Sequence, residues 1–358
     1  MSAFMKIGIG EQILFELEFR NWNQATFAEA MDISEKHASN LINNQVQLSI
    51  DLAIKLEKLF EVPAKMWLSI DNEYRLSKQE NNQLSCMELR GKLYSRFPIK
   101  NMKDLNWLDI KTSKTEELNK AIIDFIGTDD IDSFFENTPL KIAARSSEKY
   151  KDKFNIDFAK VWYRKAMLES NSLILPKYSH KNLELLMERM TGFTTTESGI
   201  ELFIKELSNC GVGFLVLPHL SHTYLDGASF YKQDNPIIVY TARHDRLDNF
   251  WFTVLHEVGH IVKGHLDKER PILDSDNFKD KSKPEKEADT FANKVLRLDE
   301  VKQATRSYNR VSKTKLEEVL EEFNFLHPSI IIGALQHARK ISYRSYNEYK
   351  VKVKHLLN

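Results

Sequence analysis

The sequence predicts a mainly α (α+β) fold in three parts: a five-helix domain over 1–76, a helical connector over 77–175, and a domain of helices plus a small β-sheet over 176–358. In the first part, short amphipathic stretches follow one another, separated by turns. The second part is rich in charge and poor in glycine and contains further helical stretches. In the third part, short runs of β-branched and aromatic residues lie among helical stretches, which is typical of a small sheet packed against helices.

The composition excludes several classes of function. Hydrophobic residues make up 42% and charged residues 28% of the 358 residues, as in a soluble protein with more than one domain. The formal net charge is zero, so any contact with nucleic acid or an anionic membrane has to be local. Cys86 and Cys210 form no C-x-x-C pair, no signal-peptide pattern is present, and the longest apolar run, 211–218, is too short to span a bilayer. We expect a cytoplasmic protein with no membrane partner.

The first part has the layout of a helix-turn-helix domain. Its second helix, "NQATFAEAM", begins at a good N-cap, Asn23, and a turn, "DIS", joins it to a third helix that Ser34 can cap. Two short helices joined in this way and supported by further helices form the DNA-binding arrangement. The remaining helices are expected over "EQILFELEFR", over "DLAIKLEKLF" with Ser49 or Asp51 as cap, and from Pro63 onward.

Residues 10–75 resemble the XRE-type helix-turn-helix of HigA-like antitoxins and repressors, and the match runs through 21–74. The resemblance implies that operator DNA is a partner and that the third helix enters the major groove. It implies a contact with backbone or base from the glutamine that opens the first motif helix. Asparagine on the outward face can read adenine. The DNA-binding residues expected on this basis are Gln24, Ser34, Lys36, His37 and Asn40.

Three departures from that family's pattern suggest weak DNA binding. Asp32 stands where a turn glycine is usual, and Glu35 stands where a basic residue is common. Residues 1–75 hold seven Lys/Arg against eleven Asp/Glu, although phosphate contacts dominate DNA affinity. A homodimer would help, as would the basic segment 339–354, whose alternative interpretation is a solvated helix face.

The third part combines strands and helices around one helix of special interest. Strands are expected over 211–218, 227–232 and 236–241, a helix over 247–263, a polar loop over 267–283, a helix from Pro284, and a mostly helical end. The helix over 247–263 carries "HEVGH" within the apolar stretch "NFWFTVLHEVGHIV", where unpaired imidazoles would be costly.

His256 and His260 share one face of this helix and can hold one zinc ion, while Glu257 can take a proton from water beside the metal. Gly264 can end the helix as a left-handed cap, and Gly259 keeps the neighbouring turn slim. A catalytic zinc needs a third protein ligand. Glu287 is the candidate, because its neighbours Ala288 and Ala292 permit close packing of the two helices. Asp289 or a residue of 266–282 is the alternative.

Residues 180–340 resemble the metallo-endopeptidase domain of the ImmA/IrrE family, through "FWFTVLHEVGHIVKGH", "EKEADTFANKVL" and "HPSIIIGALQH". The resemblance implies a zincin-like fold, Zn2+ held by His256, His260 and Glu287, and Glu257 as general base. It also implies a protein substrate, often a transcriptional repressor. His265, His219 and Tyr240 are candidate oxyanion donors. His327 is interpreted as a structural residue before a helix.

Two functions are compatible with these motifs. The first is a bacterial transcriptional regulator with zinc-dependent endopeptidase activity that cleaves a repressor or another regulatory protein. The second is an antitoxin-like repressor that binds DNA and a cognate toxin, with the peptidase domain latent or used for sensing. The full set of ligands and base favours the first function.

Overall fold

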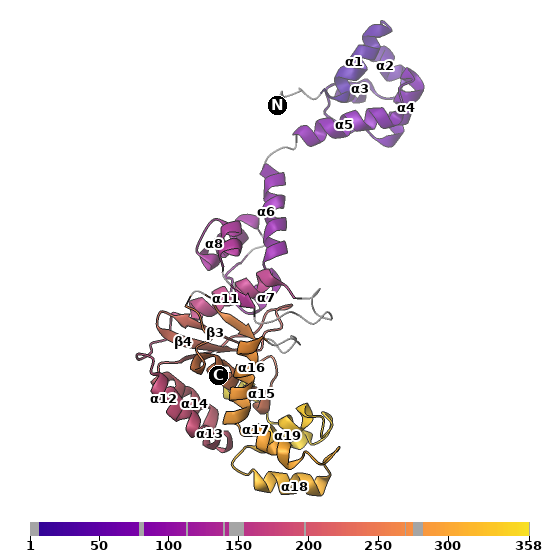
Figure 1. The fold of residues 1–358 in the computed structure, drawn as a ribbon. Coiled ribbons are helices and arrows are strands. Elements are labelled where there is room, and N and C mark those ends of the chain that lie inside the picture. The colour runs from indigo at the N-terminus through magenta and orange to yellow at the C-terminus, as the bar shows by residue number, and fades with distance from the viewer. Residues whose placement is uncertain are drawn as a thin grey trace. The chain divides into compact units, whose positions relative to one another are not determined.

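The computed structural model describes residues 7–78, 82–111, 114–138, 140–142, 154–196, 198–268, 270–274 and 282–357. It confirms a mainly helical fold with a small sheet (Figure 1). The chain divides into two compact units, Met1–Lys92 and Leu93–Asn358. Within the described residues, no helix is long and apolar enough to cross a membrane.

The first unit contains the five predicted helices. They are α1 (Ile9–Phe19), α2 (Gln24–Ala30), α3 (Glu35–Ile42), α4 (Ile50–Phe60) and α5 (Ala64–Lys78). The side chains of Asn23, Ser34 and Ser49 accept hydrogen bonds from the backbone N–H groups of Thr26, His37 and Leu52. These caps satisfy donors that the first turn of a helix leaves unpaired, which is why three starts were predictable. The core between the helices is apolar and includes Phe27, Leu41, Leu56, Phe60 and Trp67.

The predicted connector is not a separate part of the structure. The boundary at 76 falls inside α5, and α6 (Asn82–Arg96) follows it. From Leu93 onward the described residues pack with the second unit, through α7 (Ile99–Asp104), α8 (Thr115–Ile126), α9 (Ile131–Asn137) and α11 (Ile156–Ser170). Trp162 of α11 is one residue that joins these helices to the second unit. Its ring is buried, and its indole N–H donates to the carbonyl of Pro218 at 3.0 Å.

A five-stranded sheet in the order β1-β5-β3-β4-β2 organises the second unit. β3 (Gly227–Lys232) pairs antiparallel with β4 (Asn235–Tyr240) and β5 (Ile272–Asp274), and β2 (Gly213–Val216) pairs parallel with β4. β1 (Lys141–Ile142) pairs parallel with β5. The three strands expected over 211–241 are present, whereas β5 lies in the stretch expected to be a polar loop.

Helices cover both faces of this sheet (Figure 1). Side chains alternate along β3, so Phe230 faces Tyr163 of α11, while Ser229 faces α15 (Leu247–Val262). α15 is the helix predicted over 247–263, and most of its surface is buried. The remaining helices are α12 (His180–Glu188), α13 (Thr191–Thr195), α14 (Gly199–Asn209), α16 (Lys283–Val295), α17 (Leu298–Ala304), α18 (Lys313–Glu322) and α19 (Pro328–His337).

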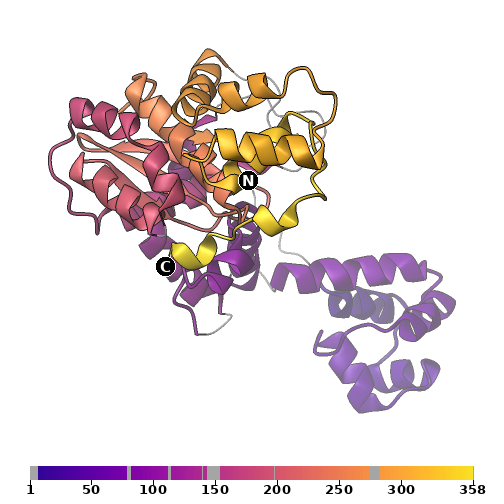
Figure 2. The same ribbon diagram turned by 90° about the horizontal axis from the view of Figure 1, so that it is seen from below.

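The basic C-terminal segment differs from the prediction of a mostly helical end. After α19 the described residues, which end at 357, form two short 3-10 turns, Asn347–Tyr349 and Lys354–Leu356. The backbone N–H of Leu247 donates to the carbonyl of Val351 at 2.9 Å, and Val353 is fully buried. Figure 2 shows this yellow segment lying against the body of the second unit. Because valines and lysines alternate here, the pattern lacks a helical period, and the segment is not a solvated helix face.

Candidate metal centre

Three polar residues lie on the buried part of α15. His256, Glu257 and His260 are exposed by 2%, 0% and 0%. The surrounding positions of the helix are apolar and pack against the sheet and against α19. Buried polar groups of this kind need partners, so their contacts decide the chemistry of the site.

Close packing of α16 against α15 supplies those partners. A Cβ atom on Gly259 would lie 3.0 Å from the Cα of Ala288, so glycine allows the two helices to approach more closely than a larger residue would without a shift. Ala288 and Ala292 are fully buried at the contact. In a helix, positions 285, 288, 289 and 292 lie on one face. Glu285 and Asp289 therefore point to α15 together with the two alanines.

Glu285 completes a compact group with the two histidines. Its Oε2 lies 3.2 Å from His256 Nε2, and its Oε1 lies 3.3 Å from His260 Nε2. The two Nε2 atoms are 3.0 Å apart. Ligand atoms that each lie about 2.0 Å from a tetrahedral zinc are separated by about 3.3 Å. The three side chains thus have the donor types and spacing of a zinc site, and they form a group that could hold a metal ion.

The charge of Glu285 suits this role. Burial alone would raise the pKa of this carboxyl, but the hydrogen bond from His256 and the nearby imidazole of His260 outweigh burial and lower the pKa to about 2. The group is therefore anionic at neutral pH, as a carboxylate ligand has to be. Its Oε1 is buried and has no hydrogen-bond partner in the described part of the chain, which is the state expected of an oxygen that a cation would satisfy.

The prediction that Glu287 is the third ligand is not supported by this geometry. The side chain of Glu287 is 41% exposed, and its Oε2 accepts a hydrogen bond from His265 Nε2 at 2.8 Å. Position 287 is about 200° around the helix from 285, so it cannot share the face that packs on α15. The four-residue spacing of Glu285 and Asp289, in phase with Ala288 and Ala292, was the signal in the sequence that pointed to Glu285 instead.

Two further acidic groups contact His256. Its Nδ1 is 2.9 Å from Asp289 Oδ1, which leaves Nε2 directed at Glu285. Asp274, at the end of β5, has its Oδ2 4.0 Å from His256 Nε2. Asp289 thus orients the ring of His256 through the nitrogen that faces away from the metal group. From the sequence, Asp289 was expected only as an alternative metal ligand. Asp274 lies within 266–282, the stretch expected to offer an alternative ligand, but it was not singled out because β5 was not recognised as a strand.

Glu257 lies beside this group, on the side facing the sheet. Its Oε2 accepts a hydrogen bond from the hydroxyl of Ser229 at 2.7 Å, while its Oε1 is buried without a hydrogen-bond partner among the residues described. A Cβ on Gly227 would lie 2.7 Å from that Oε1, so glycine keeps the space open. Burial raises the pKa of Glu257, and the nearby His256 opposes this rise. One oxygen is therefore held in place and the other is available to exchange a proton.

The three predicted oxyanion donors lie elsewhere or are already engaged. The hydroxyl of Tyr240 donates to the carbonyl of His244 at 3.1 Å and to Asn249 Oδ1 at 3.3 Å. His219 is exposed in the loop between β2 and β3. His265 contacts the outer nitrogen of His260, so its ring does not face the point where the two Nε2 atoms converge. His327 caps α19 through Nδ1, as expected of a structural residue.

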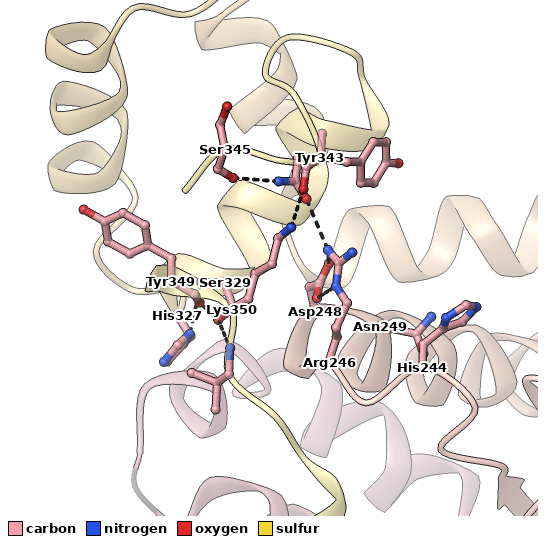
Figure 3. Close-up of polar contacts among 12 residues, drawn as sticks. His244, Arg246, Asp248, Asn249, His327, Ser329, Tyr343, Ser345, Tyr349 and Lys350 are labelled. Atoms are coloured by element: carbon pink, nitrogen blue, oxygen red, sulfur yellow. Dashed lines mark hydrogen bonds and ion pairs between the residues drawn. The ribbon is translucent and has the colours of Figure 1, made fainter. Parts of the chain in front are cut away.

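A cavity of about 390 Å³ adjoins His256 and extends along α15 toward α19. Asp274 and Asp289 line it beside the metal group, and Phe252, Leu296 and Ile330 give it an apolar wall. Figure 3 shows its far side, where Arg246 pairs with Asp248 next to Asn249 and Tyr343. Lys350 donates to the carbonyl of Tyr343, so the C-terminal segment helps to build this side.

The predicted DNA-binding residues fall into two groups in the first unit. Gln24 donates to the carbonyl of Glu35 at 3.3 Å, and Ser34 caps α3, so these two hold the motif together. Lys36 is exposed on α3, and His37 and Asn40 are half-buried on the same helix. The buried Nε2 of His37 has no hydrogen-bond partner within the described ranges.

Asp32 preserves the turn of the motif despite the missing glycine. Its φ is +52°, the left-handed backbone conformation that aspartate tolerates better than most residues. Lys55 donates to the carbonyl of Met31 at 2.9 Å and thereby ties α4 to the turn. The departure from the usual pattern therefore leaves the geometry of the two motif helices intact.

Two family comparisons match separate parts of the chain. A peptidase family described as "IrrE N-terminal-like domain" matches residues 211–324, which include the whole metal group. A family described as "Helix-turn-helix" matches residues 18–67. The chain is also 32% identical to the uncharacterized HTH-type transcriptional regulator YddM of Escherichia coli over 71 residues, 20% of this chain and 76% of that protein.

The chain belongs to the family of HTH-type transcriptional regulators, and its residues 211–324 match an IrrE-like domain. The regulator is likewise 30% identical to an uncharacterized HTH-type transcriptional regulator of Haemophilus influenzae over 56 residues, 16% of this chain. This match spans about half of the length of that relative, 52%.

Proposed function

We propose that this regulator binds operator DNA and is a zinc-dependent endopeptidase that cleaves a regulatory protein such as a repressor. One observation carries the enzymatic part. His256, His260 and Glu285 converge with the spacing of zinc ligands, beside a Glu257 carboxylate with one oxygen that no described residue hydrogen-bonds. Glu285 replaces Glu287 in the ligand set. The match to a peptidase family supports the same reaction class.

The chain's own residues would perform the proton transfers of peptide hydrolysis. Zinc, when bound, supplies Lewis acidity that activates water and polarises the peptide carbonyl. Glu257 Oε1 accepts the proton of the attacking water and then passes it to the leaving amine. The hydroxyl of Ser229 holds the other oxygen in place, so the carboxylate does not have to reorganise between the two steps.

The cavity beside His256 would bind the substrate. Its apolar wall suits an aliphatic or aromatic side chain next to the bond that is cut. The substrate class follows from the other end of the chain. A DNA-binding module on the same polypeptide raises the effective concentration of the peptidase near proteins that bind the same stretch of DNA. A repressor bound nearby is the substrate class that this arrangement favours.

Removal of zinc tests the enzymatic proposal. The full-length protein is incubated with a cell extract from a strain that lacks it, and new protein N-termini are identified by mass spectrometry. We expect a small set of cleavage sites that disappears when a chelator removes zinc and returns when zinc is added back. Cleavage that persists in the zinc-free protein would contradict the proposal.

Substitutions on α3 test the proposed DNA binding. A single bidentate base contact contributes about 1–3 kcal/mol, so Asn40→Ala is expected to weaken binding to a selected operator by roughly 5- to 150-fold. Lys36→Ala is expected to weaken binding to all sequences and to reduce the salt slope by about 1. Both are measured by fluorescence anisotropy at several salt concentrations.

Lys58→Ala is the matched control for these two variants, because it removes one exposed charge from α4 of the same domain. Its operator affinity is expected to stay within about twofold of the wild-type value. If Asn40→Ala and Lys36→Ala also bind as the wild type does, α3 is not the helix that enters the groove. The stoichiometry of the same complex tests the proposed homodimer, for which we expect two chains per operator.

A further inference from the structure

Two further side chains extend the hydrogen bonding outward from His260. His260 Nδ1 lies 3.2 Å from His265 Nδ1, and His265 Nε2 lies 2.8 Å from Glu287 Oε2. The turn after α15 makes this contact possible. Gly264 has a φ of +67°, and the backbone N–H of His265 donates to the carbonyl of His260 at 2.9 Å, so the chain folds back on the helix end. His265 is 9% exposed and Glu287 is 41% exposed.

Once His260 Nε2 is a metal ligand, the hydrogen bonds that join His260, His265 and Glu287 can run in only one direction. A neutral imidazole that binds a metal through Nε2 carries its proton on Nδ1. His260 Nδ1 is then the donor, so His265 Nδ1 has to accept. The proton of a neutral His265 therefore lies on Nε2, where the carboxylate of Glu287 accepts it. The two contacts and the ligand role of His260 are consistent with a single set of proton positions.

We propose that His265 and Glu287 are positioning residues that fix the tautomer and ring orientation of His260 for zinc binding. This inference rests on the proposed zinc site. The arrangement is independent of the one that serves His256, whose Nδ1 contacts Asp289 directly. Each ligand histidine thus has its own carboxylate outside the metal group. Asp289 contacts His256 directly, whereas Glu287 acts on His260 through the imidazole of His265. Glu287 contributes to the metal site from outside, although it is not in contact with the ligand atoms.

The expected size of the effect follows from the place of each residue. Loss of an outer partner of a metal-binding histidine typically lowers metal affinity by about 10–100-fold. His265 is almost buried and contacts His260 directly, so His265→Leu is expected in the upper part of that range. Glu287 is partly exposed and acts through His265, so Glu287→Ala, which removes the acceptor of the His265 Nε2–H, is expected to lower zinc affinity by a few-fold to about tenfold.

Zinc affinity of the full-length protein is the measurement, by competition with a zinc-binding dye. His265→Gln should keep most of the affinity, because its amide oxygen can accept from His260 and its amide nitrogen can donate to Glu287. The double variant His265→Leu, Glu287→Ala should bind zinc no more weakly than His265→Leu, because Glu287 acts only through His265. A purely structural role predicts neither the rescue nor the non-additivity.

Glu300→Gln is the matched control, because it changes an exposed carboxylate of α17 that pairs with Arg297. Its zinc affinity should equal that of the wild type. Wild-type affinity in His265→Leu, or additive losses in the double variant, would overturn the inference while leaving the zinc site standing. A wild-type protein that binds no zinc would overturn the proposed function itself. If His265→Leu does not fold, as judged by circular dichroism, unchanged affinity in Glu287→Ala would be sufficient to reject the proposal.

Discussion

Glu257→Gln is expected to lower the rate of proteolysis by about two to four powers of ten, while zinc content and DNA binding remain those of the wild type. The amide keeps the size of the side chain and can still accept the hydrogen bond from Ser229. It cannot accept a proton from water or carry it to the leaving amine. The carboxylate does not belong to the group of His256, His260 and Glu285, so zinc should stay bound. Cleavage rates, zinc content and operator affinity are measured on the same preparation.

Ser229→Ala provides the matched comparison for this variant. It removes the hydroxyl that holds Glu257 Oε2 but leaves the base in place, so a smaller loss of rate is expected than in Glu257→Gln. Zinc loss in Glu257→Gln would identify the carboxylate as a ligand and would refute the assigned role. Cleavage at the wild-type rate with zinc bound would mean that hydrolysis takes place at another site. If neither protein cleaves anything, the enzymatic proposal fails, and the antitoxin-like repressor becomes the proposal to test by a search for a toxin partner.

Glu285→Gln is expected to weaken zinc binding by more than a hundredfold, whereas the same substitution at Glu287 weakens it by no more than about tenfold. The reason is geometric. Glu285 is buried and lies 3.2–3.3 Å from both Nε2 atoms, so its neutral amide removes an anionic ligand. Glu287 is separated from them by His265. Metal content after dialysis and affinity by dye competition measure the difference.

The two variants control for each other, because both change one glutamate of α16 to glutamine. Thermal unfolding of the zinc-free proteins shows whether either substitution disturbs the fold. A larger loss of zinc in Glu287→Gln than in Glu285→Gln would restore the ligand set that the sequence suggested and would refute the one derived from the structure. Equal affinities in both variants and the wild type would mean that the third ligand is neither residue, and Asp274 would be the next candidate.

The sequence by itself determined the features that depend on neighbours along the chain. The caps at Asn23, Ser34 and Ser49, the strands within 211–241 and the helix that carries His256 and His260 follow from local hydrogen bonding and from periods of 2 and 3.6 residues. The fold class and the two matching families also follow from local patterns. The pair of histidines could be placed on one helical face because their spacing alone fixes their relative direction.

The tertiary structure alone decided what depends on contacts between distant segments. The choice between Glu285 and Glu287 required the rotation of α16 about its axis, which is set by packing of Ala288 on Gly259. β5 is recognisable only through its pairing with β3 and β1, because three residues carry too little periodicity. Trp162 joins the supposed connector to the second unit, and Val353 draws the basic end into the core. In each case burial against a partner far away in sequence outweighs local preference, and that partner is not visible in the local pattern.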